Sequence, residues 1–471
     1  MQDFPHQLTP ALLSLTHALS ASAYDMRIAR YLDEGWQDIA LLADGMLCAG
    51  LNARTEAERQ QSLESAERVQ AHLARSNPLT QVLDIRRRRE DGAGCKAMVL
   101  SHPLMDGRWL VAISFTGTTR HLADWLDNLR IEQEDGFHQG FLRLTRQFEA
   151  QCGQIAMPCL GAALSRPGLT LAGVLDMLKY ERSPVSLVVT GHSQGAALMQ
   201  IFIAHLLQNG VLPQYVLGCG FASPCVAGAR TLKNADYPIY HIVHADDAVP
   251  RIGGAMHLGL CRVMPDTPAL RGLCYGARSQ DPIFNELLCL QHTVRGTRGA
   301  LCFFIALLRL LCVVPEEDAE LLYRALAPAF LPGMLQSRLV GYARRLVGSA
   351  LRRLESRYAA CFGEMDMQQM ERYTRWLQSL FARYGMRETL SRLPDALHMP
   401  HMLYRIDTLC AYDVISGAAP RRLLPALWSG DESPVWDQRP PRPPAPVHRP
   451  AYDRFHPLSG QRRTAQRRKM L

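Results

Sequence analysis

The chain has 471 residues, of which 48% are hydrophobic and 20% charged, the composition of an ordinary globular protein long enough for two or three domains. The formal net charge of +8 is unevenly placed, because residues 438–471 carry nine Arg or Lys against one acid and the rest is close to neutral. The main body therefore has no basic bias toward nucleic acid, and we expect no nucleic-acid partner.

The cysteines and the N-terminus also restrict the function classes. The 13 cysteines lack C-x-x-C or other metal-type spacing, so they are interpreted as small buried side chains in a reducing compartment. The N-terminus lacks the basic and apolar regions of a signal peptide. We therefore expect a cytoplasmic protein, with export by a route that needs no cleavable signal left open.

The first part of the chain changes from a helical to a strand pattern near residue 80. Leucines at helical spacing and a run rich in Glu, Gln, Ala and Arg predict a helical N-terminal region over 1–79. Period-two patterns then predict strands at 80–87, 96–101 and 109–115, joined by hairpin turns at 90–92 and 106–107. Helices are predicted to follow at about 122–129 and 138–152.

The middle of the chain alternates strands and helices. Short apolar runs predict strands at 185–190, 215–221 and 239–244, with a helix at 195–207 after the first of them. This alternation predicts a mostly parallel sheet with helices on both faces, and an α/β core over 80–264.

From 265 to 393 the sequence becomes apolar and Arg-rich at helical spacing, which predicts a large helical insertion. Residues 394–430 are predicted to return to the core, and the Pro- and Arg-rich segment 431–471 to be a disordered tail. Within the insertion, Ala300–Val314 is strongly apolar but too short to span a bilayer. By default such a segment is interpreted as a buried core helix. The alternative is a lid or interfacial helix over the active site, and this alternative is the one that we put forward for testing.

The motif Gly191-His192-Ser193-Gln194-Gly195 has the G-x-S-x-G pattern. Alone the pattern is weak, but here it joins an apolar strand to a helix, as a nucleophile elbow requires. Such a turn exposes the serine Oγ at the carboxyl edge of the sheet and aims amide groups of the helix N-terminus at a developing oxyanion. Ser193 is therefore the candidate nucleophile.

Three further blocks around this motif resemble the class 3, or fungal-type, lipase family. They are Phe115-Thr116-Gly117-Thr118 with Asp124-Trp125-Leu126-Asp127-Asn128-Leu129, then Phe137-His138-Gln139-Gly140-Phe141, and then Ala222-Ser223-Pro224-Cys225-Val226-Ala227-Gly228. The resemblance implies an α/β-hydrolase-type fold: a mostly parallel sheet with flanking helices and, in this chain, a large helical insertion between the catalytic Asp and His.

The same resemblance implies the remaining site residues. The D-x-V-P block identifies Asp247 as the triad acid, with Asp246 as the rival, and the H-x-x-Y block identifies His401 as the histidine, with His398 and His292 as alternatives. His257 and His138 resemble non-catalytic positions of the family. The oxyanion donors would be the backbone amides of Gln194 and Thr118. Thr116 replaces the arginine usual in the family, which makes the geometry of this loop an open question.

The implied activity is hydrolysis of carboxylic esters of lipids, either acylglycerols or glycerophospholipids, through an acyl-enzyme and without a cofactor or metal. The implied partners are a lipid ester substrate and a membrane surface contacted through the insertion and the basic tail. Two alternatives remain from the sequence: a catalytically inactive lipase-like scaffold, and a membrane-attacking phospholipase delivered into other cells.

Overall fold

The computed structural model describes residues 8, 10–25, 28–43, 81–84, 95–118, 133–228, 237–244, 246–254, 256–264, 272, 275–294, 296–312 and 340–406. The turn at 90–92, the helix at 122–129 and the tail from 431, all predicted from the sequence, lie outside these residues.

An eight-stranded, mostly parallel sheet forms the centre of the fold, in the order β10-β9-β8-β7-β4-β3-β1-β2. Its strands are β1 Gln37–Ala43, β2 Gln81–Asp84, β3 Ala97–Pro103, β4 Trp109–Phe115, β7 Val185–His192, β8 Val216–Phe221, β9 Ile239–His244 and β10 Leu260–Met264. Strands β4, β7, β8, β9 and β10 are parallel, and β3 is antiparallel to both β4 and β1. A short β5–β6 pair, Gln133–Glu134 and Phe137–His138, lies apart from this sheet.

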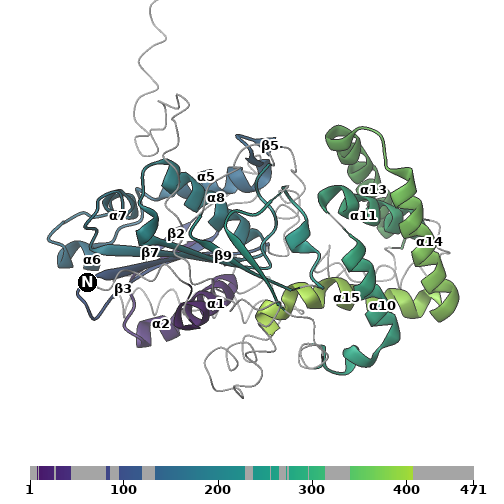
Figure 1. The fold of residues 1–471 in the computed structure, drawn as a ribbon, viewed down its shortest axis with the longest axis horizontal. Coiled ribbons are helices and arrows are strands. Elements are labelled where there is room, and N and C mark those ends of the chain that lie inside the picture. Colours follow the sequence, from purple (N-terminus) through teal and green to yellow (C-terminus); the bar gives the residue numbers. More distant parts are fainter. Residues whose placement is uncertain are drawn as a thin grey trace, which may run out of the picture.

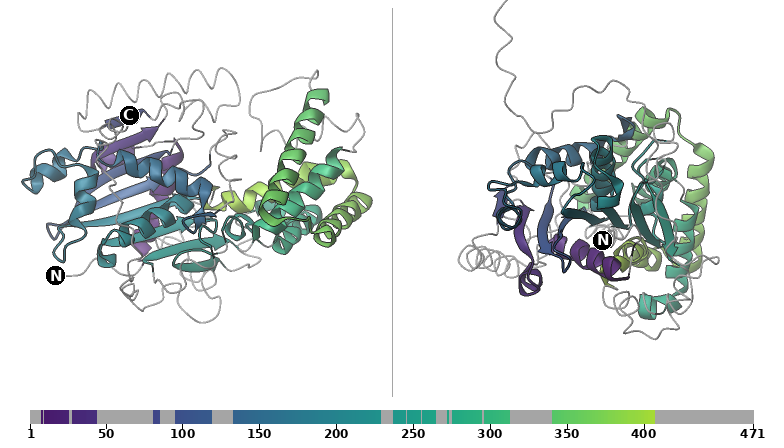
Figure 2. Two further views of the ribbon diagram at one scale, coloured as in Figure 1. Left: turned by 90° about the horizontal axis from the view of Figure 1, so that it is seen from above. Right: turned by 60° about the vertical axis from the view of Figure 1, so that its left-hand side comes forward.

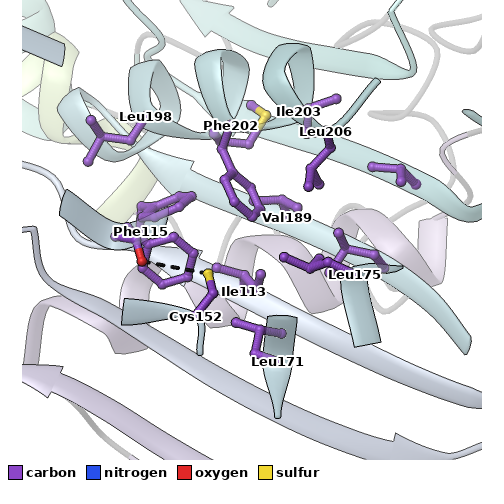
Figure 3. Close-up of a cluster of buried hydrophobic side chains, with 14 of the residues drawn as sticks. Ile113, Phe115, Cys152, Leu171, Leu175, Val189, Leu198, Phe202, Ile203 and Leu206 are labelled. Carbon is purple, nitrogen blue, oxygen red and sulfur yellow. Dashed lines mark hydrogen bonds between the residues drawn. The ribbon is translucent and has the colours of Figure 1, made fainter. Parts of the chain in front are cut away.

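Helices cover both faces of the sheet, as the buried central strands require. Figure 1 shows α1 Pro10–Asp25 and α2 Ala29–Asp33 on one face and α5 Gln139–Gln151 and α8 Gln194–Gln208 on the other. The short helices α6 Pro158–Ala163 and α7 Leu171–Met177 lie on the α5 side. Figure 3 shows the core on that side, where Phe202 of α8 packs near Phe115 of β4, with their ring centroids 5.8 Å apart. The α/β architecture predicted from the sequence is confirmed.

The beginning of the sheet differs from the sequence prediction in two ways. Residues 1–79 are not wholly helical, because Gln37–Ala43 is a strand, and this strand separates β2 from β3. The hairpin predicted between 80–87 and 96–101 is therefore wrong, whereas the β3–β4 hairpin with its turn at 106–107 is confirmed. Leu and Ala dominate β1, and their high helix propensity hid a strand that is stabilised by its neighbours in the sheet.

A helical region follows the sheet in the chain and lies beside it (Figures 1 and 2). It comprises α10 Pro282–Thr293, α11 Gly296–Cys312, α13 Val340–Phe362, α14 Met367–Tyr384 and α15 Met386–Ile406. These helices share a hydrophobic core of their own, separate from the two cores on the faces of the sheet. The helical insertion predicted from the sequence is thus present in its described parts.

The apolar segment that begins at Ala300 is the central helix of this region. In α11, Phe303 and Leu307 are almost wholly buried, and the helix packs against α13 and α14. The Phe303 ring meets that of Tyr373 edge-on at 5.7 Å. This burial agrees with the default interpretation as a core helix for the described part of the segment, and the lid stays a prediction. Among the described helices, none combines the length and apolar character needed to cross a bilayer.

The last helix, α15, runs from the helical region to the sheet and has two prolines, Pro394 and Pro400, in its interior. The sequence analysis placed a boundary at 393/394, and a proline at this point would usually end a helix. Because Pro400 has no N–H, it cannot bond the carbonyl of Ala396, and the side chain of Gln291 from α10 donates to this carbonyl instead. The helix therefore continues across the predicted boundary to Ile406.

Candidate active site

The strand-to-helix turn at Ser193 has the strained backbone of a nucleophile elbow. β7 ends at His192 and α8 begins at Gln194, and Ser193 between them has φ 57° and ψ −127°. A positive φ is rare for a residue with a Cβ and persists only where the surroundings enforce it. Here the Ser193 amide donates to the carbonyl of Phe221 at the end of β8, 2.9 Å away.

Two glycines make this turn sterically possible. A Cβ on Gly191 would lie 2.4 Å from the carbonyl carbon of Gly195, and a Cβ on Gly195 would lie 2.2 Å from the carbonyl oxygen of Phe115. Both distances are far below an ordinary contact, and both involve backbone that cannot rotate away. The elbow is therefore packed directly on the end of β4, where the loop that follows Phe115 begins.

That loop contains one of the two predicted oxyanion donors, Thr118, and it passes over the elbow. A Cβ on Gly117 would lie 2.5 Å from the carbonyl oxygen of His192, which places the loop backbone against the turn. The other predicted donor, the Gln194 amide, is the first of α8, where amide groups point outward along the helix axis. Thr116, which stands where the family has arginine, is held by its own bonds: its hydroxyl donates to the carbonyl of Ala23 and its amide to the carbonyl of Lys96, each at 3.0 Å.

The structure brings Ser193, His401 and Asp247 into one hydrogen-bonded chain. His401 Nε2 lies 2.8 Å from Ser193 Oγ, and His401 Nδ1 lies 3.0 Å from Asp247 Oδ2. A carboxylate accepts, so Nδ1 carries the proton and Nε2 is the acceptor facing the serine hydroxyl. The other oxygen of Asp247 accepts from the Val249 amide at 2.9 Å, which fixes the carboxylate. Asp247 and Ser193 are 1% and 7% exposed, so water has little access to these two ends of the hydrogen-bonded chain.

The rival acid and one rival histidine pair with each other instead. Asp246 is fully buried, and its two oxygens lie 2.5 Å from His292 Nε2 and 2.8 Å from the Tyr275 hydroxyl. His292 belongs to α10, so this pair joins the helical region to the end of β9. His257 lies 2.6 Å from the carbonyl oxygen of Ser223. The side chain of His398 lies outside the described residues.

Burial keeps several nearby groups uncharged. It lowers the pKa of His241 on β9 to about 3, and lowers that of His257 as well. Burial raises the pKa of the Cys225 thiol to about 12, so this residue is not a thiolate at neutral pH.

His138, predicted to be structural, caps α5 by accepting from the Phe141 amide. The described part of the chain contains no cluster of three or more His, Cys, Asp or Glu arranged to bind a metal.

The sequence indicated no role for two residues that lie next to the site. His192 occupies a variable position of the G-x-S-x-G pattern, and Tyr24 belongs to α1, far from every motif. The His192 ring lies 2.7 Å from the Tyr24 hydroxyl through Nδ1 and 2.9 Å from the carbonyl oxygen of His401 through Nε2. A tyrosine in an N-terminal helix carries no local signal that could have identified it.

The comparisons with known proteins agree with the motifs. The family model "Lipase (class 3)" matches residues 112–256, a span that includes the elbow and Asp247 and ends before His401. A search of curated proteins gave no match. Three similar solved structures are the propeptide complex of Rhizomucor miehei lipase, lipase II from Rhizopus niveus and a fungal lipase–inhibitor complex.

The similarity to these structures is distant. The Rhizomucor miehei complex is 15% identical over 54% of this chain and 68% of its own, with a TM-score of 0.30. The Rhizopus niveus lipase is 15% identical over 55% and 82%, with a TM-score of 0.29, and the inhibitor complex 17% identical over 51% and 73%, with a TM-score of 0.28. The family match and the motifs agree: residues 112–256, about a third of the chain, match the class 3 lipase family.

Proposed function

We propose that this protein hydrolyses carboxylic esters of lipids with Ser193 as nucleophile, His401 as general base and Asp247 as the acid that orients the histidine. The single observation that carries this proposal is the hydrogen-bonded chain from Ser193 Oγ through His401 to Asp247, with distances of 2.8 and 3.0 Å. The three residues come from the turn between β7 and α8, from α15 and from the turn after β9, so their meeting is not a by-product of sequence proximity.

In the first half of the reaction, His401 Nε2 takes the proton of the Ser193 hydroxyl while Oγ bonds to the ester carbonyl carbon. The carbonyl π electrons move to its oxygen, and the amides of Gln194 and Thr118 donate to the oxyanion. Asp247 stabilises the imidazolium that forms. When the intermediate collapses, the bond to the alcohol oxygen breaks and the alcohol leaves with the proton from His401 Nε2.

In the second half, His401 takes a proton from water, and the water oxygen bonds to the acyl carbon of the acyl-enzyme. Collapse of this second intermediate breaks the bond between the acyl carbon and Ser193 Oγ. Ser193 recovers its proton from His401, and the fatty acid leaves. The products are one alcohol and one carboxylic acid for each water consumed.

The substrate class proposed is an acylglycerol or a glycerophospholipid, in keeping with the family of residues 112–256.

We further propose that the corner between α13 and α14 contacts the lipid surface. Phe362 and Met367 at this corner are 36% and 59% exposed, and exposed Arg352 and Arg353 lie on the same helix as Phe362. The arginines lie about 14 Å from Phe362 along the helix, and exposed Glu364 lies in the corner itself, so the two apolar side chains would carry the contact. The double variant F362S/M367S should bind phosphatidylglycerol vesicles less well in sedimentation and keep its activity on a soluble ester; unchanged vesicle binding would contradict this contact.

The test of the proposed activity compares the wild-type protein with Ser193→Ala. The substrates are p-nitrophenyl butyrate, emulsified tributyrin and phosphatidylcholine vesicles. On every substrate that the wild type hydrolyses, we expect kcat/KM to fall by roughly 10³-fold or more in the variant, with unchanged circular dichroism. Ester hydrolysis that persists near the wild-type rate in a folded Ser193→Ala variant would overturn the proposal, and so would a wild type that hydrolyses none of the three esters.

A further inference from the structure

Helix α1 makes an indirect contact with the candidate histidine through the His192 ring. His192 Nε2 lies 2.9 Å from the carbonyl oxygen of His401, and a carbonyl can only accept, so Nε2 carries the proton. In the neutral ring Nδ1 is then the acceptor, and the Tyr24 hydroxyl 2.7 Å away is its donor. The hydrogen bonds therefore run in one direction, from Tyr24 through His192 to the backbone of His401.

The same end of α1 also holds the loop with the oxyanion donor. The Thr116 hydroxyl donates to the carbonyl of Ala23, the residue before Tyr24. A Cβ on Gly117 would lie 1.9 Å from the Tyr24 hydroxyl oxygen, so the loop backbone rests on this side chain. One turn of α1 thus contacts both sides of the candidate site, the oxyanion loop and, through His192, the base.

His401 needs such an anchor because of the proline that precedes it. Pro400 cannot donate to Ala396, so the regular hydrogen-bond ladder of α15 is interrupted one residue before His401. The bond to the His401 carbonyl attaches the helix to the elbow immediately after this interruption. A displacement of about 1 Å at a catalytic base is enough to lower a rate by roughly 10²-fold.

We propose that Tyr24 and His192 are positioning residues that hold His401 in line with Ser193 and keep the oxyanion loop on the elbow. This inference rests on the proposed function, in which His401 is the general base. In this account α1 contributes to catalysis through Tyr24. The histidine of the G-x-S-x-G pattern contributes by donating its Nε2–H to the backbone carbonyl of His401.

The test uses two pairs of variants. His192→Gln keeps a donor near the position of Nε2, whereas His192→Met has a similar length and no donor. Tyr24→Phe removes one hydroxyl, and Tyr180→Phe makes the same change at a tyrosine that is 70% exposed. Because a lost hydrogen bond to a positioned group corresponds to a rate loss of about tenfold, we expect His192→Met and Tyr24→Phe to lower kcat at least about tenfold on p-nitrophenyl butyrate with little change in KM.

The controls separate positioning from a general structural role. His192→Gln should recover kcat to within about threefold of the wild type, and Tyr180→Phe should leave it unchanged. All four variants are compared by thermal unfolding, so that a folding defect is recognised. Unchanged kcat in folded His192→Met and Tyr24→Phe, or a His192→Gln variant as slow as His192→Met, would overturn the inference. If instead wild-type hydrolysis did not depend on Ser193, the proposed function itself would fail.

Discussion

The close contact between the elbow and the end of β4 makes Gly195→Ala a sharp test of the site geometry. The added Cβ would lie 2.2 Å from the carbonyl oxygen of Phe115, where an ordinary contact needs at least about 3 Å. The elbow and β4 must therefore separate by roughly 1 Å. This displacement changes the position of Ser193 relative to His401 and that of the oxyanion loop relative to both residues. We therefore expect kcat to fall by about 10²-fold. The strain should also lower the free energy of unfolding by about 1–3 kcal/mol.

The assay is steady-state hydrolysis of p-nitrophenyl butyrate, with urea denaturation of the same preparations. The matched control is Gly348→Ala in α13, where the nearest atom to an added Cβ is a guanidinium nitrogen of Arg352 at 3.6 Å. This control should keep its activity and gain about 0.5–1 kcal/mol in stability, since alanine is a better helix former than glycine. A Gly195→Ala variant with kcat within twofold of the wild type would show that the elbow does not need this close contact.

Three further predictions concern the groups around the site. Asp247→Asn should lower kcat by roughly 10⁴-fold, whereas Asp246→Asn should cost about 1–3 kcal/mol of stability with kcat within about tenfold; the reverse order in ester kinetics would exchange the roles of the two acids. Because burial lowers the pKa of His241 to about 3 from an ordinary 6.5, the unfolded chain binds a proton that the folded one does not as the pH falls below 6.5. The stabilising contribution of His241 is therefore complete above pH 6.5 and is lost toward pH 3 by about 1.4 kcal/mol per pH unit. His241→Gln should flatten this slope in urea denaturation at pH 7, 5.5 and 4, and parallel curves for the two proteins would contradict the effect of burial. Burial raises the pKa of the Cys219 and Cys225 thiols to about 12, so iodoacetamide at pH 8 should leave both unlabelled in the folded protein while it modifies exposed Cys289, as read by peptide mass spectrometry; equal labelling of Cys225 and Cys289 would contradict it.

The sequence predicts the parallel part of the fold well because its signals are local. A continuous apolar run marks β7, and a helix begins directly after the G-x-S-x-G turn. Strand β1 could not be predicted in this way, because its Leu and Ala residues favour a helix and its pairing partners lie about 40 to 60 residues away in the sequence. The continuation of α15 through Pro400 was equally hidden, since the donor that replaces the missing N–H comes from Gln291, more than 100 residues earlier.

The residues of the candidate site also fall into those that local motifs predict and those that only tertiary packing brings together. Ser193 and Asp247 lie in short motifs that also define their local backbone, and His401 lies in a weaker motif beyond the helical region. Tyr24 and the pair of Asp246 with His292 depend on how α1 packs on the sheet and how α10 meets the end of β9. Such contacts join elements distant in the chain, and no spacing along the sequence specifies them. Two interpretations of Ala300–Val314 were left open for a related reason: an apolar helix must be covered, but its sequence does not say whether lipid or protein covers it. In the structure, protein covers the described part of this segment.

The most direct test of Ser193 as an activated nucleophile is covalent labelling with a fluorophosphonate, which reacts with a serine only when a neighbouring base activates it. The wild-type protein should gain one adduct, and peptide mapping should locate it on Ser193. Ser193→Ala should gain none, and His401→Ala and Asp247→Asn should label far more slowly than the wild type while remaining folded. Absence of labelling in the wild type, or an adduct at another serine that persists in Ser193→Ala, would contradict the triad of Ser193, His401 and Asp247.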